Sequence, residues 1–443
     1  MKETKNYKLL KPEQTDYYNI NDFNANADVI DRKLFEANAH VGDIVIQGYR
    51  TNNPDYLLCD GTLLPPAGYP ELFDKISYDY TTEWGVYWEA GSLGAYNVTI
   101  KSNCWSPALK LFVAVGQNSS TSNGCIYTSP DGKTWINQLE VPVSFSGVCW
   151  SPEKGMFLAV ATDDVGSIYF YTSEDGITWT ESFSSYSRYT TSAVCWSAKN
   201  NTFVVFGRIN YSSQMTAFCT SDGTDVEEMV DVGDWNTYIT TVCWSPELEI
   251  FVAAGYNMPC SSVFFTSPDG IEWNLEEESA DDSQINSVCW SAEWETFVAV
   301  GKETTGSMYP VVYQSEDGIA WSRNPSYNLG TRPYTCLNSV CWSSEKDKFM
   351  AVGYDSYEGP VFVESTDGGY SWDRQRANST SINNETLTIC WAPEIETYSA
   401  MGDTKSIYSP NVCYYSQDES LFALPSYNNG MKYTYIRAKE SEE

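Results

Sequence analysis

The sequence predicts a mainly β protein, in which a seven-bladed β-propeller is inserted in a small second domain and preceded by a short N-terminal helix. A Cys-Trp pair recurs at intervals of 45 to 52 residues, and a Ser-x-Asp-Gly-x-x-Trp turn follows the pair at a constant phase in most copies. A period in the forties, built from short strands between turns, is typical of propeller blades rather than of helical repeats. The pairs are Cys104-Trp105, Cys149-Trp150, Cys195-Trp196, Cys243-Trp244, Cys289-Trp290, Cys341-Trp342 and Cys390-Trp391.

Each copy contains the pattern of four strands, as the fifth copy illustrates. Residues 286–291 are rich in β-branched and aromatic residues, and 296–301 (TFVAVG) are apolar enough to be buried on both faces. Residues 311–314 form a third candidate strand, and the turn SEDGIAW leads into a fourth near Trp321. In that turn the Ser and Asp side chains can accept backbone hydrogen bonds, and Gly supplies a positive φ angle.

This turn resembles the Asp-box of sialidase-type propellers. The sixth copy, Ser365 to Trp372, has one extra residue, and the third keeps only Ser221-Asp222-Gly223. In that family the box is structural, so the resemblance implies a fold and not an activity. Full matches are Ser129 to Trp135, Ser173 to Trp179, Ser267 to Trp273 and Ser315 to Trp321.

Composition excludes several classes of function. With 26 basic and 59 acidic residues the net charge is −33, which disfavours nucleic acid and anionic membrane surfaces as partners. No apolar run reaches the roughly 20 residues that span a bilayer, and the N-terminus lacks the apolar core of a signal peptide. With His40 as the single histidine, neither a metal site nor a cofactor is expected.

The cysteines fit free thiols better than disulfides. Seven of the 13 belong to the repeat, and equivalent positions in different blades should lie too far apart for the roughly 5.5 Å Cα separation of a disulfide. Because neighbouring residues of a strand point to opposite faces, each of these cysteines is expected at the same buried position in its blade.

Before the repeats, a helix is predicted to begin at Asn21. Phe23, Ala27, Ile30, Leu34 and Ala37 follow at alternating spacings of four and three, which is a short a/d seam. This face either packs on its own domain or associates with other copies of the chain.

The flanking segments carry a second resemblance. Residues 9–34 are similar to the opening of tail-fibre proteins of phages of Gram-positive bacteria. Val41 to Ile76, with its Leu-Cys-Asp-Gly turn at Leu58 to Gly61, resembles the phage tail collar domain. The closing elements of that domain appear only at the far end, as Phe422 to Pro425 and Tyr433 to Lys439.

The resemblance implies a propeller inserted into the collar domain. We therefore expect an attachment segment at 1–40, a split collar-like domain at 41–79 plus 419–443, and the propeller at 80–418. The last copy lacks a fourth strand. Thr81 to Trp88 is expected to supply it and so close the ring.

Recognition is expected on the loops that join second to third strands and one blade to the next, because these vary in length and are rich in tyrosine. The collar domain should leave the ring from the opposite edge. The ligand-binding candidates are Tyr186, Arg188, Tyr189, Tyr211, Tyr256, Tyr327, Arg332, Tyr334, Tyr354 and Tyr357.

Together these features predict a receptor-binding tail-fibre protein of a phage or phage-tail-like particle, made in the host cytoplasm and located in the virion tail. Its expected partners are other tail or baseplate proteins and a host cell-surface glycan or protein, and the collar resemblance implies a homotrimer.

A sialidase-like glycosidase is one alternative, with Asp163, Asp282 and Asp355 as candidate carboxylates. No arginine lies in the Phe-Arg-Ile-Pro context of those enzymes, so no catalytic residue is expected. A purely structural baseplate or decoration protein is the other alternative.

Overall fold

The chain divides into two compact units in the computed structural model. One comprises Met1–Trp84 with Glu419–Glu443, and the other Gly85–Asp418. The structure describes residues 97–186, 189–209, 214–226, 228–306, 308–324, 333–375 and 384–404, together with residue 93 and the short segments 2–3, 10–11, 44–47, 56–58, 63–64, 87–90, 414–417, 422–423 and 433–437. The helix predicted after Asn21 lies outside the described residues.

In the first unit, strands from the two ends of the chain pair with each other. β34 (Tyr433–Arg437) lies between β3 (Ile44–Gln47) and β4 (Tyr56–Leu58), and β33 (Phe422–Ala423) pairs with β5 (Leu63–Leu64). A separate hairpin joins β1 (Lys2–Glu3) to β2 (Leu10–Lys11). Segments on either side of the second unit in the sequence therefore share a sheet.

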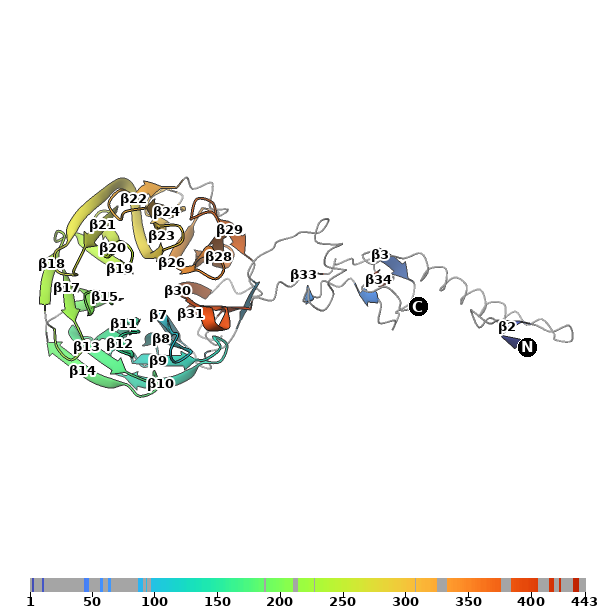
Figure 1. The fold of residues 1–443 in the computed structure, drawn as a ribbon, viewed down its shortest axis with the longest axis horizontal. Helices are drawn as coiled ribbons and strands as arrows, with labels where there is room; N and C mark the ends of the chain where they lie inside the picture. The colour runs from blue at the N-terminus through green and yellow to red at the C-terminus, as the bar shows by residue number, and fades with distance from the viewer. Residues whose placement is uncertain are drawn as a thin grey trace. The chain divides into compact units, whose positions relative to one another are not determined.

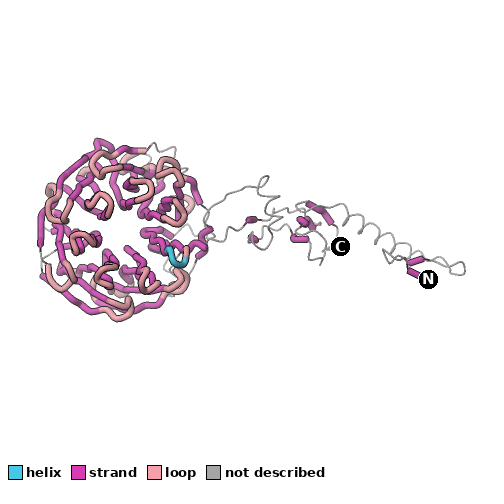
Figure 2. The backbone as a smooth tube through the Cα atoms, in the orientation of Figure 1, coloured by secondary structure: helices cyan, strands magenta, loops and turns pink. Residues whose placement is uncertain are grey.

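The second unit is a ring of antiparallel sheets with a propeller-like arrangement, and strands make up most of it (Figures 1 and 2). Three four-stranded sheets come first in the chain: β7 (Val98–Ser106), β8 (Leu111–Asn118), β9 (Gly124–Ser129) and β10 (Ile136–Val141); β11 (Ser144–Ser151), β12 (Met156–Thr162), β13 (Ser167–Ser173) and β14 (Thr180–Tyr186); and β15 (Tyr189–Ser197), β16 (Thr202–Ile209), β17 (Met215–Thr220) and β18 (Glu228–Val232).

A seven-stranded sheet follows, because one long strand is shared. It contains β19 (Thr237–Ser245), β20 (Ile250–Asn257), β21 (Ser261–Ser267), β22 (Asn274–Ser291), β23 (Thr296–Glu303), β24 (Pro310–Ser315) and β25 (Ser322–Arg323). The first half of β22 pairs with β21 and the second half with β23, so β22 serves as the last strand of one group of four and the first of the next.

Two more four-stranded sheets complete the ring. One contains β26 (Thr335–Ser343), β27 (Lys348–Asp355), β28 (Gly359–Ser365) and β29 (Asp373–Gln375). The other contains β30 (Asn384–Ala392), β31 (Thr397–Thr404), β32 (Tyr414–Gln417) and β6 (Tyr87–Ala90), with the 3-10 turn η3 (Pro393–Ile395) between β30 and β31.

The second strand of each group is buried on both faces, as the apolar run at 296–301 predicts. In β23 the residues from Thr296 to Gly301 are all buried, and in β8 Phe112 to Val115 have no exposed surface. These strands lie inside their own sheets and between the neighbouring ones, so both pleat faces meet apolar side chains.

The ring closes between strands from opposite ends of the second unit. β6 pairs with β32, which confirms that an N-terminal strand completes the last group, although the strand occupies Tyr87–Ala90 rather than 81–88. Trp88 is fully buried and stacks on Phe362, with ring centroids 4.2 Å apart. On the other side of the junction Asn103 donates to the carbonyl of Ser399 (3.0 Å) and accepts from Thr388 (2.7 Å).

The Ser-x-Asp-Gly turns repeat one hydrogen-bond pattern. In the fifth copy Ser315 Oγ accepts from the Gly318 amide, Asp317 Oδ1 accepts from the amides of Ile319 and Ala320, and Trp321 Nε1 donates to the Gly318 carbonyl. Gly318 has a φ of 76°, which an L side chain rarely adopts.

The third copy shows a different assignment from the one predicted. Thr220, not Ser221, occupies the position of the serine, because its Oγ1 accepts from the Gly223 amide (2.9 Å). Val226 takes the place of the tryptophan and packs into the neighbouring core. The turn of the third copy therefore begins at Thr220, one residue before the predicted Ser221.

Tryptophan–glutamate hydrogen bonds link successive groups. In five of the Cys-Trp pairs the indole donates to a glutamate in the first turn of the preceding group, at 2.6–2.8 Å. The bonded residues are Trp105–Glu394, Trp196–Glu153, Trp290–Glu247, Trp342–Glu293 and Trp391–Glu345. Trp150 differs: Ala108 stands at the glutamate position, and the buried Trp150 Nε1 has no partner among the described residues.

The Cys-Trp cysteines are half-buried rather than buried, which corrects the prediction. They lie on the first strands and are free thiols that pack against the next group in the ring. Cys104 has Cys149 and Cys390, from the first strands of the two adjacent groups, as its neighbours, and burial raises the pKa of the Cys104 thiol. Because first strands are innermost, their side chains have a neighbouring sheet on only part of their surface.

Candidate functional site

The ring has two edges with different construction. We call the turn edge the one that carries the Ser-x-Asp-Gly turns and the turns between first and second strands. The loop edge carries the loops between second and third strands and the links between groups, and backbone bonds join these two kinds of segment. Examples are Met258 N to Asn236 O (3.0 Å), Thr304 N to Asp282 O (2.8 Å) and Ser356 N to Tyr334 O (3.3 Å).

Tyr334 and Tyr357 form an exposed aromatic pair at the loop edge. Their rings meet edge to face at 6.0 Å, with 45% and 67% of each residue exposed. Both lie at the sheet of β26–β29, in a link and a loop that the sequence analysis singled out.

A buried carboxylate fixes the backbone beneath this pair. Asp355 is fully buried and accepts from the amides of Tyr357 (2.8 Å) and Glu358 (3.2 Å) and from the Thr335 hydroxyl. Arg374 lies 3.8 Å from Asp355 and 2.8 Å from Glu358, which places a positive charge beside both carboxylates. The link and the loop are therefore held to the same buried carboxylate, although their tyrosines are exposed.

A second aromatic group lies at the junction of β16 with the β19–β20 hairpin. Tyr256 stacks on Tyr238, with ring centroids 4.8 Å apart and an interplanar angle of 3°, and the Arg208 guanidinium lies 3.9 Å from the Tyr238 centroid. All three residues are half-buried. Burial raises the pKa of the Tyr256 hydroxyl, so it remains a hydrogen-bond donor at neutral pH.

The other candidate residues that the structure describes are not gathered into one site. Tyr189 is the first residue of β15, buried against Phe218, and is a core residue rather than the loop residue predicted. Tyr186 ends β14, and Tyr354 is half-buried in β27. Arg188, Tyr211, Tyr327 and Arg332 lie outside the described residues.

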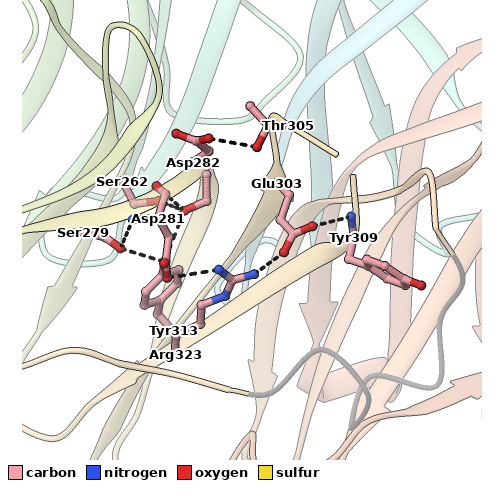
Figure 3. Close-up of polar contacts among 10 residues, drawn as sticks. Ser262, Ser279, Asp281, Asp282, Glu303, Thr305, Tyr309, Tyr313 and Arg323 are labelled. Atoms are coloured by element: carbon pink, nitrogen blue, oxygen red, sulfur yellow. Dashed lines mark hydrogen bonds and ion pairs between the residues drawn. The ribbon is translucent and has the colours of Figure 1, made fainter. Parts of the chain in front are cut away.

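A polar network occupies the loop edge between β21 and β25 (Figure 3). Arg323 extends between Asp281 (3.0 Å) and Glu303 (2.6 Å). The Tyr313 hydroxyl lies 3.2 Å from both Ser279 Oγ and Ser283 Oγ, on the shared strand β22. Burial alone would lower the pKa of Arg323, but its hydrogen bonds to the two carboxylates outweigh this and raise the pKa.

The carboxylates considered for glycoside hydrolysis hold loops in place. Asp163 accepts from the amides of Val165 and Ser167 and from the Tyr169 hydroxyl, and Asp282 accepts from the Thr305 hydroxyl. Burial opposes the ionised form of Asp163, but these hydrogen bonds outweigh it and hold its pKa below the usual value. Asp163 therefore serves as a fixed hydrogen-bond acceptor in its loop.

Two hollows lie on the turn edge between neighbouring groups in the described part of the chain. One, of about 550 Å³, lies between the turns after β24 and β28 and includes Trp294 and Tyr370. The other, of about 730 Å³, lies between the turns after β13 and β17 and includes Met156 and Asp222. Sequence reasoning missed both. Trp294, at a position where the other copies have Leu, Lys, Asn or Ile, was the available signal.

No cluster of three or more His, Cys, Asp or Glu side chains that could hold a metal ion occurs among the described residues. Within the same residues, no helix has the length and apolar character needed to cross a membrane.

No family model matches the chain, and no curated protein matches it. A chain of the solved structure described as "Crystal Structure of Mitotic Checkpoint Complex" is similar to it, with a TM-score of 0.50 and 10% identity over 83% of this chain and 95% of that chain. At this identity the likeness bears on the fold alone. It supports a β-propeller-like architecture for the ring and carries no functional information.

Proposed function

We propose that this chain is a receptor-binding protein of a phage or phage-tail-like particle, whose ring binds a bacterial surface ligand through its loop edge. The observation that carries the proposal is the exposed Tyr334–Tyr357 pair, in a link and a loop that the buried Asp355 joins through Thr335 and the Tyr357 amide. Exposed aromatic rings on a rigid backbone lose little conformational entropy on binding, and tyrosine offers both a flat apolar face and a hydroxyl. A surface glycan is the ligand class that suits these features.

We further infer that the ring has seven blades. The first strands β7, β11, β15, β19, β22, β26 and β30 contact one another in this order, and β30 contacts β7. Because β22 belongs to two groups of four, the seven-stranded sheet counts as two blades.

The proposal assigns binding and not hydrolysis to the ring. Four carboxylates at the loop edge are occupied by loop amides or by Arg323, which suits a fixed surface better than proton transfer: Asp163, Asp281, Glu303 and Asp355. Hydrolysis of a fluorogenic sialoside or of a bound surface glycan by the full chain would contradict this assignment.

The remaining parts of the proposal rest on the tail-fibre and collar resemblances. Residues 1–40 and the split domain would attach the ring to other tail or baseplate proteins in the virion, as a homotrimer. Sedimentation analysis of the full chain at micromolar concentration tests the oligomer: a mass of three chains is expected, and a monomer would remove this part.

The binding proposal is tested with the double variant Tyr334→Asn, Tyr357→Ala. Asparagine is chosen because residue 334 has a φ of 64°, which Asn tolerates better than Ala. On an array of bacterial surface glycans, the variant should lose at least about tenfold in affinity, since stacking aromatics dominate such interfaces.

The matched control is the double variant Ile177→Ala, Ile319→Ala. These side chains are 55% and 51% exposed, but they lie in the Ser-x-Asp-Gly turns of the other edge. Binding should be unchanged in this variant. Loss of binding in the control with none in the tyrosine variant would place recognition on the turn edge and overturn the proposal.

A further inference from the structure

The smaller hollow on the turn edge combines exposed aromatic rings with buried amide groups. Trp294, in the turn between β22 and β23, is 40% exposed, and Tyr370, in the turn between β28 and β29, is 62% exposed. Between them lie Gln314 and Asn324, which are 8% and 7% exposed. The hollow measures about 550 Å³, which lies in the range of small-ligand sites.

Trp294 is exposed but fixed in position. Its Nε1 donates to Asp347 Oδ1 (2.9 Å), and its ring lies against the backbone of Gly368 so closely that a Cβ on Gly368 would come within 2.8 Å of Cε3. Gly368 belongs to the one Ser-x-Asp-Gly turn with an extra residue. The inserted glycine and the tryptophan therefore fit each other across the boundary between two groups.

The amides of the hollow present acceptors. Gln314 Nε2 donates to the Gly368 carbonyl and Asn324 Nδ2 to the Gly369 carbonyl, which orients both side chains. Their oxygens, Oε1 and Oδ1, have no hydrogen bond within the described part of the chain, although both residues are more than nine-tenths buried. A carbonyl oxygen accepts up to two hydrogen bonds, so a ligand that fits here brings donors.

The charge of the rim limits the ligand class. Glu316 and Asp317 both line the hollow, and the Asp317 carboxylate already accepts from two turn amides. An anionic ligand would meet these carboxylates at close range, whereas neutral hydroxyls or an ammonium group would not be repelled.

The larger hollow shows which of these features come from the repeat and which are particular. It has the same position relative to its turns and includes Thr172, Glu174, Asp175 and Asp222. It has no aromatic residue among those lining it, and Lys154 stands where Trp294 stands in the smaller hollow. In these two hollows the repeat framework therefore provides the hollow and its carboxylates, and the smaller hollow, between β22–β25 and β26–β29, adds the aromatic pair.

From these features we infer that the Trp294–Tyr370 hollow is a binding site for a neutral or amino-substituted saccharide. The aromatic faces would stack on the apolar faces of sugar rings, and hydroxyl groups would donate to Gln314 Oε1 and Asn324 Oδ1. This site lies on the turn edge and goes beyond the proposed function, which places receptor recognition on the loop edge.

The test uses the full chain on an array of neutral, amino-substituted and acidic oligosaccharides, with wild type and Trp294→Ala compared at equal concentration. Some neutral or amino-substituted glycans should lose their signal in Trp294→Ala and keep it in the Tyr334→Asn, Tyr357→Ala variant. The strongest of them is then titrated by calorimetry. Trp294→Ala should weaken its binding at least about tenfold, and Trp294→Phe, which keeps an aromatic face, by less than about threefold.

The matched control is Leu248→Ala, at the equivalent turn position of a neighbouring group and 39% exposed. It should leave binding unchanged, and thermal melting of each variant checks that the ring is folded. The inference is overturned if no neutral or amino-substituted glycan depends on Trp294, or if only acidic glycans or a basic peptide compete for the site. Either result leaves the loop-edge proposal intact, because that proposal depends on the tyrosine variant alone.

Discussion

At the scale of single residues, stability at the turn edge depends on carboxylates that accept several bonds at once. The amide of Ala320 and then that of Ile319 lower the pKa of Asp317, and the amides of Thr178 and Ile177 do the same for Asp175. Since the turn recurs around the ring, these hydrogen bonds from turn amides to an aspartate contribute to stability in several groups. The aspartates of these turns are therefore structural, as the Asp-box resemblance implied.

Replacing Asp317 with Ala should destabilise the ring by about 1–2 kcal/mol at pH 7, because two turn amides lose their acceptor. The pKa of Asp317 is lower in the folded chain than in the unfolded one. Its contribution is therefore present above the unfolded value of about 4, and it is lost as the pH falls through the lower folded pKa. Urea unfolding at pH 7 and at pH 3 should show that the difference in free energy of unfolding between wild type and variant is smaller at pH 3. A difference that grows on acidification contradicts this account, and Glu316→Ala is the control.

The unpartnered Trp150 indole offers a gain of stability. Ala108→Glu places a carboxylate where the other linked groups have one, and it should raise the free energy of unfolding by about 1 kcal/mol. In the same chain Trp196→Phe should cost stability, because it removes the bond to Glu153. A double-mutant cycle of Ala108→Glu with Trp150→Phe measures the coupling by denaturant unfolding. No coupling between the two positions would show that the introduced carboxylate does not reach the indole.

At the scale of elements, the closure of the ring depends on β6, a strand of only four residues. Its pairing with β32 covers an edge that would otherwise expose unpaired backbone groups. Within this strand Trp88 lies against Phe362 and Tyr398, in the neighbouring and the same sheet. The side chain and the strand pairing thus close the ring together.

Trp88→Ala should destabilise the second unit by about 3–5 kcal/mol, as expected when a fully buried large aromatic side chain is removed. Trp235→Ala is the control, because Trp235 is 67% exposed and its loss should change stability by less than about 0.5 kcal/mol. Guanidinium unfolding followed by circular dichroism measures both. Equal stability of the two variants would mean that the ring does not depend on the β6 closure.

At the scale of the whole molecule, the thiols of the Cys-Trp pairs recur on the first strand of each group around the ring. Burial raises the pKa of Cys149, Cys243 and Cys390 to about 12, with nearby backbone amides opposing the shift only in part. A thiol reacts as its thiolate, so partial exposure alone does not make these cysteines reactive.

Native chains at pH 8 should therefore react with a disulfide reagent at these thiols at least about 100-fold more slowly than unfolded chains, whose cysteines have a pKa of about 8.5. The rate is followed by release of the coloured thiol with and without denaturant, and labelled peptides are assigned by mass spectrometry. Rapid native labelling of Cys149 or Cys243 would show that the first strands open or that the pKa of these thiols is not raised.

The sequence by itself determined the features that depend on local chemistry and repeat phase. The strands around each Cys-Trp pair, the turn bonds of Ser315 and Asp317, and the N-terminal strand that completes the last group all follow from residue type and spacing. The tertiary structure decided what depends on neighbours far apart in the chain. It buried Tyr189, stacked Arg208 on Tyr238, left Trp150 without its acceptor, and formed the Trp294–Tyr370 hollow from two groups. Burial and stacking at such boundaries depend on how adjacent sheets pack, and a repeat period specifies the sheets but not the side chains that meet between them.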